Sequence, residues 1–189
     1  MPEFILKKIK RLYCIREGFD LSAIVTMAEF TFEVRDKTIT ITGLRKRARE
    51  VVIPARINDI PVTHIGDRAF EQSQLTSVSI PNSVTHIGIL AFAWNPLTTL
   101  TISDSITSIG GWAFAGSQLA SIIIPNTATH IGNRAFIGSL LISITFGRAG
   151  TITGKNFIDN EGNLKALYSS GGAGTYTRSN ANSANWIQQ

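Results

Sequence analysis

One block of residues recurs four times at a fixed interval, and it limits what this chain can fold into. A phenylalanine returns every 22 residues, each time preceded by alanine and, four positions earlier, by glycine. A unit of this length is too small to bury its own apolar face and must stack on its neighbours. The repeat therefore predicts a solenoid. The two clearest columns are Phe70, Phe92, Phe114 and Phe136, and Gly66, Gly88, Gly110 and Gly132.

Composition supports one ordered domain and argues against a nucleic-acid surface. The 189 residues are 43% hydrophobic and 16% charged, which is enough apolar material for a single core. The net charge is +5, but residues 1–50 hold 11 Lys or Arg and 7 Asp or Glu, whereas residues 51–189 hold 7 and 6. Nucleic acid binds to a basic stripe along the contact face, and the repeats lack one. The single cysteine, Cys14, excludes an intrachain disulfide.

Residues 1–28 are interpreted as a leader of uncertain structure. The basic stretch around Lys7 resembles the start of an export signal, but Arg16, Glu17 and Asp20 interrupt the apolar run that must follow. The same charges exclude a membrane-spanning helix here. Met27 lies directly before the first strand pattern and is an alternative start of translation.

Residues 29–50 are expected to form an N-terminal cap. Residues 30–34 and 38–42 alternate apolar and polar side chains, as strands do, and the three-residue polar link between them suits a hairpin. Its apolar residues would share one face and cover the first coil: Phe30, Phe32, Val34, Ile39 and Ile41. The basic stretch 43–50 has two interpretations, a contact for an acidic partner or a solvated loop.

From Val51 onward each coil is expected to have three parts. A short strand turns residues such as Val78 and Ile80 inward, a second extended piece does the same with Ile87, and the Ala-Phe turn follows. In-register stacking sets like residues about 4.8 Å apart, so the phenylalanines form one interior column. The glycine column suits either a positive φ or a close approach of backbones. A polar column after each Phe is expected to bond turn amides: Ser73, Asn95, Ser117 and Ser139.

Residues 75–92, LTSVSIPNSVTHIGILAF, resemble the BspA-like leucine-rich repeats of bacterial surface proteins, in a 22-residue variant. The resemblance covers residues 30 to about 167, with weaker agreement in a fifth coil. It implies an α/β leucine-rich-repeat solenoid that is predominantly β, with short helical turns and the N-terminal β-hairpin cap. The expected organisation is a leader at 1–28, the hairpin cap at 29–50, a solenoid of about five coils at 51–168, and a flexible C-terminal tail or cap at 169–189.

The resemblance also implies a function. Proteins of this kind are mostly non-enzymatic protein-binding modules, so we expect surface adhesion or contact with a host or partner protein, on the cell surface or after secretion. The alternative from another class is a structural repeat protein whose open ends stack between chains. The oligomeric state is left open by the residues.

Candidate chemical sites in the sequence are weak. His64, His86 and His130 share one column, and the first two are within reach of a shared metal, but two imidazoles without a third ligand make a poor site. The alternative is that these side chains simply point outward. Gly154 and Lys155 lack the flanking residues of a phosphate loop. No Ser, His and acid combination stands apart from the repeat, so we predict no enzymatic activity, no metal and no cofactor.

Two surfaces are candidate partner sites. A hydroxyl-rich strand face suits an extended partner, although Ser and Thr are also ordinary soluble strand formers. An apolar turn-side patch is flanked by charged coils, as binding sites often are. The alternative is internal packing, with Trp94 over Gly116 and Trp112 against the cap or a neighbour. The strand face comprises Ser77, Ser79, Thr99, Thr101, Ser121, Ile123, Ser143 and Thr145, and the turn-side patch comprises Ile89, Leu90, Trp94 and Trp112.

Overall fold

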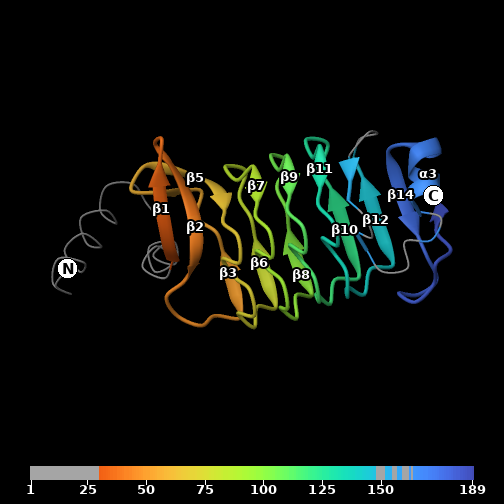
Figure 1. The fold of residues 1–189 in the computed structure, drawn as a ribbon, viewed down its shortest axis with the longest axis horizontal. Coiled ribbons are helices and arrows are strands. Elements are labelled where there is room, and N and C mark those ends of the chain that lie inside the picture. Colours follow the sequence, from red (N-terminus) through yellow and green to blue (C-terminus); the bar gives the residue numbers. More distant parts are fainter. Residues whose placement is uncertain (1–29, 148–151, 155–156, 159–161, 163) are drawn as a thin grey trace, which may run out of the picture.

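The computed structural model describes residues 30–147, 152–154, 157–158, 162 and 164–189. Over these residues the chain is an elongated solenoid, with its first strands at one end and its last strands at the other (Figure 1). The expected leader at 1–28, including the alternative start at Met27, lies outside the described residues, as does part of the fifth coil.

A β-hairpin opens the described chain. Strand β1 (Phe30–Arg35) pairs antiparallel with β2 (Thr38–Leu44). Asp36 and Lys37 connect the strands, and both have positive φ, 48° and 60°. This is the two-residue turn whose twist matches that of the strands. The expected three-residue link was therefore one residue too long, because Arg35 still belongs to β1.

The hairpin joins the solenoid through β2, which lies parallel to β5 (Ile60–Ile65). Beyond β5 each coil adds one strand parallel to the one before, with counterparts opposite each other: Ile65 faces Ile87, and Ile87 faces Ile109. The predicted stacking of like residues is confirmed. The other strands of this sheet are β4 (Arg56–Ile57), which is antiparallel to β5, and β7 (His86–Ile87), β9 (Ser108–Ile109), β11 (His130–Ile131) and β13 (Ile152–Thr153).

A second series of strands runs alongside the first (Figure 1). It consists of two sheets, ordered β3-β6-β8 and β10-β12-β14-β15, with parallel pairing between coils and antiparallel pairing at β14 and β15. The break between the two sheets falls between β8 and β10. The strands are β3 (Glu50–Val52), β6 (Ser77–Ser79), β8 (Thr99–Thr101), β10 (Ser121–Ile124), β12 (Ser143–Phe146), β14 (Gly174–Thr177) and β15 (Ile187–Gln188).

The Ala-Phe turns are hydrogen-bonded turns and are not helical. Each turn donates its N–H groups to carbonyls of the next coil, as from Phe70 to Ala91 at 2.7 Å. Two residues per turn have left-handed backbone, which a right-handed helix excludes. One such column is Arg68, Leu90, Trp112 and Arg134, and the other is Gln72, Trp94, Gly116 and Gly138. Among the described residues the single helix is α3 (Leu164–Gly171).

The phenylalanine column forms one stack in the interior. All four rings are buried, and neighbouring rings lie 5.0 to 5.3 Å apart with planes 3° to 9° from parallel. Phe30 contacts the first ring, Phe70, edge-on at 6.2 Å. At the other end Ile158 pairs with Phe136 and is buried in the next column position. The predicted interior column is confirmed.

The glycine column is required by close approach of backbones, not by positive φ. Its members are absent from the positive-φ residues of the described chain. A Cβ on Gly110 would lie 2.5 Å from the carbonyl carbon of Gly88, and one on Gly132 would lie 2.4 Å from the nitrogen of Gly111. Successive backbones therefore pass too closely for any side chain.

Residues 169–189, expected as a flexible tail or cap, contain the end of α3 together with β14 and β15. β14 pairs antiparallel with β12, and β15 pairs with β14. Tyr176 and Trp186 are both buried. Arg178 lies 4.6 Å from the ring of Trp186, and its Nε donates to the carbonyl of Leu141 at 2.7 Å. These contacts hold the last two strands against the coil before them.

Candidate functional site

The turn-side patch is built on the turns of two neighbouring coils. Leu90 and Trp112 occupy the same left-handed column, each with φ of 59°, and the Leu90 N–H donates to the carbonyl of Gly111 at 3.0 Å. A left-handed backbone at a residue with a side chain costs on the order of 1 to 2 kcal/mol, so the stacking of the coils must impose it. The same backbone fixes the direction in which both side chains leave the turn.

Trp94 and Trp112 form the centre of the patch. Their ring centroids lie 6.4 Å apart, with planes tilted by 44°. The ring of Trp94 covers Gly116, where an added Cβ would lie 2.6 Å from the Cε3 atom of Trp94. The guanidinium of Arg134 lies 4.9 Å from the centroid of the Trp112 ring, which is cation–π distance. Trp112 is therefore contacted by Trp94 and by Arg134.

Exposure shows that the patch is only partly packed within the molecule. Trp94 lies on Gly116, as the internal-packing alternative predicts, yet 46% of Trp94 remains exposed. Ile89 is 51% exposed, and Leu90 and Trp112 are half-buried. Large apolar side chains held on a rigid backbone and partly open to solvent are a surface on which a partner can gain binding energy.

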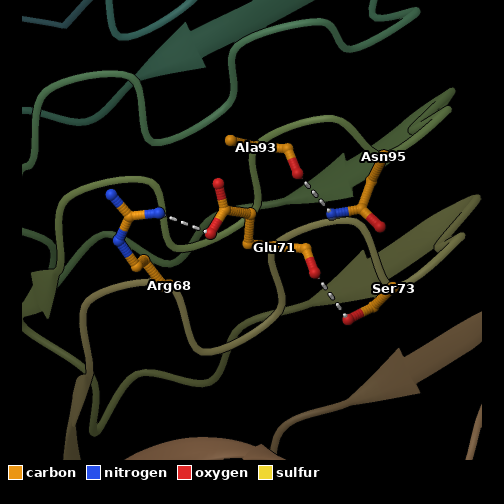
Figure 2. Close-up of polar contacts among 5 residues, drawn as sticks. All are labelled: Arg68, Glu71, Ser73, Ala93 and Asn95. Atoms are coloured by element: carbon orange, nitrogen blue, oxygen red, sulfur yellow. Dashed lines mark hydrogen bonds and ion pairs between the residues drawn. The ribbon is translucent and has the colours of Figure 1, made fainter.

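Polar contacts hold the turn of the coil that precedes the patch (Figure 2). Arg68 and Glu71 form an ion pair at 2.9 Å, and the Ser73 hydroxyl donates to the carbonyl of Glu71 at 3.4 Å. Arg68 is the left-handed residue of this turn. The ion pair therefore holds this turn across its residues 68–71. Arg68 occupies the column position that Leu90 and Trp112 occupy in the next two coils.

Asn95 joins two coils beside the patch. It is fully buried, and its amide nitrogen donates to the carbonyl of Phe70 at 2.7 Å. The same nitrogen donates to the carbonyl of Ala93 at 3.3 Å (Figure 2). Its oxygen accepts the Leu75 N–H at 2.9 Å, as expected for this polar column. The expectation fails at its later members, because among the described residues no partner reaches the hydroxyls of Ser117 and Ser139.

The strand face places its hydroxyl side chains in two rows across β6, β8, β10 and β12. The rows are interrupted between β8 and β10, which belong to different sheets. Ile123 is 69% exposed within the face, and Val52 on β3 is 62% exposed beside it. The facing pairs are Ser77 with Thr99, Ser79 with Thr101, Ser121 with Ser143, and Ile123 with Thr145.

Strand β14 extends the strand face, which the sequence analysis missed. Thr175 and Thr177 lie opposite Thr145 and Ser143, and the hydroxyls of Thr145 and Thr175 are 2.8 Å apart. The alternation of these threonines with the buried Tyr176 was the signal in the sequence. The sequence analysis assigned residues 169–189 to a tail or cap and did not extend the strand face into them.

The histidine column brings two imidazoles together but no third ligand. The rings of His64 and His86 stack at 4.7 Å, and each Nδ1 lies 2.8 Å from the hydroxyl of the preceding threonine. Burial, and then the neighbouring His86, lower the pKa of His64 from its ordinary value of 6.5. Within the described ranges no three His, Cys, Asp or Glu side chains are grouped to hold a metal ion. His130 lies beyond Ser108 in this column.

Comparison with known repeats decides the family. The sequence model of the BspA type leucine-rich repeat region matches residues 50–175 in six copies. The chain belongs to the BspA type leucine-rich repeat family. The match covers the coils expected from the sequence and continues through α3 into β14.

Solved structures similar to this BspA type chain are bacterial leucine-rich repeat proteins. One from Bacteroides capillosus is 34% identical with a TM-score of 0.51, over 55% of this chain and 83% of that one. One from T. pallidum is 19% identical with a TM-score of 0.49, over 70% and 81%. One from Bacteroides ovatus is 23% identical with a TM-score of 0.47, over 69% and 41%. No curated protein matches the chain.

Membership in the BspA type family makes the chain a repeat scaffold for protein interaction, since leucine-rich repeat proteins are generally non-enzymatic binding modules. In the part of the chain that the structure describes, no helix is long and apolar enough to cross a bilayer.

Proposed function

We propose that the chain is a non-enzymatic module that binds a protein in surface adhesion or in contact with a host or partner protein, and that it docks this protein on the turn-side patch. The observation that carries the proposal is the Trp94 and Trp112 pair, with 46% of Trp94 open to solvent. Trp and Arg are the residues most often found at the energetic centre of protein interfaces.

The geometry of the patch favours binding because little of it has to become ordered. Leu90 and Trp112 leave a backbone that is already held by the hydrogen-bond ladder between coils. Trp112 is further held between Trp94 and Arg134. Side chains that are already ordered lose less conformational entropy when a partner arrives. A partner that inserts an apolar side chain beside Trp94 and places a carboxylate near Arg134 would complement the patch.

The strand face is the competing surface for the same function. Its exposed Ile123 and its rows of Ser and Thr offer an extended partner many small contacts. It has no exposed aromatic residue, however, and its ladder is interrupted between β8 and β10. Small hydroxyl side chains contribute little to binding energy at protein interfaces. We therefore assign the principal contact to the turn-side patch.

Quantitative capture with two matched double variants tests this assignment. The immobilised chain is exposed to solubilised surface proteins, and each captured protein is identified by mass spectrometry. Leu90→Ser with Trp112→Ser disrupts the patch, and Val52→Ser with Ile123→Ser removes two exposed apolar residues near the strand face. Thermal unfolding establishes that both variants fold. We expect the first variant to lose about tenfold or more in affinity for the captured protein, and the second to retain it.

The opposite ranking of the two variants would assign the contact to the strand face, and equal capture by all three chains would refute the proposal. Sedimentation velocity at several concentrations separates partner binding from the structural alternative. If the captured protein is the chain itself and the sedimentation coefficient rises with concentration, the solenoid is a self-associating component and the proposed function is wrong.

A further inference from the structure

A cleft of about 430 Å³ lies at the N-terminal end of the solenoid. One wall comes from the hairpin and the basic stretch after it, with Thr31, Thr42 and residues 43–47. The other wall comes from the first Ala-Phe turn, with Ala69, Gln72 and Ser73. The cleft is separate from the turn-side patch, and the function proposed above does not use it.

Among the described residues no turn precedes the first Ala-Phe turn, and this leaves the cleft open. In the next coil the carbonyl of Ala91 accepts the N–H of Phe70, and that of Ala93 accepts the N–H of Gln72. The counterpart of Ala91 in the first coil is Ala69, whose carbonyl accepts no hydrogen bond among the described residues. Gly43 lies there instead, since a Cβ on it would be 3.2 Å from the Ala69 oxygen. The opening is thus a regular consequence of where the repeats begin.

Among the described residues, the charged side chains that line the cleft are all positive. They are Arg45, Lys46 and Arg47. The Nε of Arg45 donates to the carbonyl of Phe30 at 3.2 Å, which anchors the loop to β1. Lys46 and Arg47 are exposed and have no ion pair or hydrogen bond within the described ranges. Adjacent cations without counter-charges repel each other, and a bound anion would relieve that repulsion.

The rest of the lining restricts the kind of anion. The hydroxyls of Thr31 and Thr42 are 3.1 Å apart, and Gln72 and Ser73 add an amide and a third hydroxyl. A fully deprotonated inorganic ion such as sulfate offers no donor to these oxygens or to a carbonyl such as that of Ala69. Sugar hydroxyls both donate and accept, and the carboxylates and sulfates of acidic sugars match the guanidinium and ammonium groups. Ligand sites usually measure about 300 to 1,000 Å³, and the cleft is within that range.

We propose that this cleft binds an acidic sugar of a glycan chain, with Lys46 and Arg47 contacting its carboxylate or sulfate and the Thr, Ser and Gln side chains contacting its hydroxyls. In this proposal the basic stretch 43–50 contacts an acidic partner and is not merely a solvated loop. It also gives the chain a second ligand class that is independent of the protein partner.

Isothermal titration calorimetry on the full chain tests the proposal with a heparin-derived tetrasaccharide, an uncharged tetrasaccharide of glucose, and a glutamate peptide of the same net charge as the heparin fragment. Lys46→Gln with Arg47→Gln removes two charges from the cleft. Arg35→Gln with Lys37→Gln removes two charges from the same hairpin, one at the end of β1 and one in the turn, outside the cleft. Circular dichroism verifies the fold of both variants, whose substituted side chains are exposed.

We expect the heparin fragment to bind, the neutral sugar not to bind, the cleft variant to lose about tenfold or more in affinity, and the hairpin-turn variant to stay within about twofold. No binding of the heparin fragment would overturn the proposal. An equal loss in both variants would also overturn it, because it would show diffuse attraction, and so would equal affinity for the glutamate peptide. Both variants retain the turn-side patch, so this outcome is independent of protein capture.

Discussion

The ring of Phe92 lies 5.3 Å from that of Phe114, with the two planes 3° from parallel, although the residues are 22 positions apart in the sequence. The same relationship repeats along the column, so each interior ring contacts its counterpart in the coils on both sides. Stability is thereby shared between neighbouring coils, and the turns that carry Leu90, Trp94 and Trp112 rest on this stack.

Replacing Phe92 by alanine tests the stack. The substitution leaves a cavity between two rings that cannot close without shifting whole coils, so we expect the free energy of unfolding to fall by about 3 to 5 kcal/mol. Urea denaturation followed by circular dichroism measures the loss. Ile89→Ala, at an exposed position three residues away, is the control and should change the free energy of unfolding far less. Equal losses for the two variants would contradict interior stacking.

The glycine column predicts a sharp contrast between two adjacent residues. A Cβ on Gly110 would lie 2.5 Å from the backbone of Gly88, whereas one on Gly111 has its nearest contact at 3.1 Å, with the Asn133 carbonyl. We expect Gly110→Ala to destabilise the chain by about 3 kcal/mol, because backbone atoms must move, and Gly111→Ala to cost about 1 kcal/mol or less. Thermal or urea unfolding measures both, and a larger loss at Gly111 would be inconsistent with this packing.

Asn95 and Ser117 occupy the same column but should differ in their contribution to stability. Asn95→Ala leaves the buried N–H of Leu75 and the carbonyl of Phe70 without their partner, which costs about 2 to 4 kcal/mol for the several bonds lost. The buried hydroxyl of Ser117 has no partner among the described residues, so Ser117→Ala should be neutral or slightly stabilising. Chemical denaturation of the pair tests this, and comparable losses at both sites would count against it.

The stacked histidines predict a dependence of stability on pH. The pKa of His64 is lowered from 6.5 by burial and then by His86, so the folded chain favours the neutral ring. The unfolded chain binds the proton more readily, and stability should therefore be complete above about pH 6.5 and fall as the pH drops through the lowered pKa. His86→Gln removes the second cause and should raise the pKa of His64. NMR titration of the His64 ring reports this pKa, and an unchanged value would refute the coupling.

The solenoid could be predicted from the sequence at positions where packing between coils requires the same residue in each repeat. Phe92 and Gly110 belong to columns that stay constant through four coils, because the ring stack and the close backbone contact favour the same residue in each of them. The left-handed turns could not be predicted, since Leu90 and Trp112 are poor residues for that backbone and vary between coils. Strand β14 was missed because its pairing with β12 is distant in the sequence and depends on the fold already being formed.

In the candidate site, too, some contacts could be predicted from the sequence and others could not. The contact of Trp94 with Gly116 was one of the two alternatives offered by the sequence, and it is present in the structure. The position of Arg134 over Trp112 was not, because long side chains on the surface choose among several neighbours. The N-terminal cleft could not be seen in the sequence, since it lies between the hairpin and the first Ala-Phe turn, where no earlier turn is present among the described residues. Patterns within the repeat are thus predictable, and features at its ends require the structure.

Acrylamide quenching of tryptophan fluorescence, with and without the captured protein, tests the central claim most directly. The chain has three tryptophans, of which Trp186 is buried, so quenching reports mainly on Trp94 and Trp112. If the partner docks on the turn-side patch, the quenching constant should fall when the complex forms, and the fall should be absent with a partner variant that no longer binds. A quenching constant that stays unchanged while sedimentation shows the complex to be formed would place the partner elsewhere and contradict the proposed site.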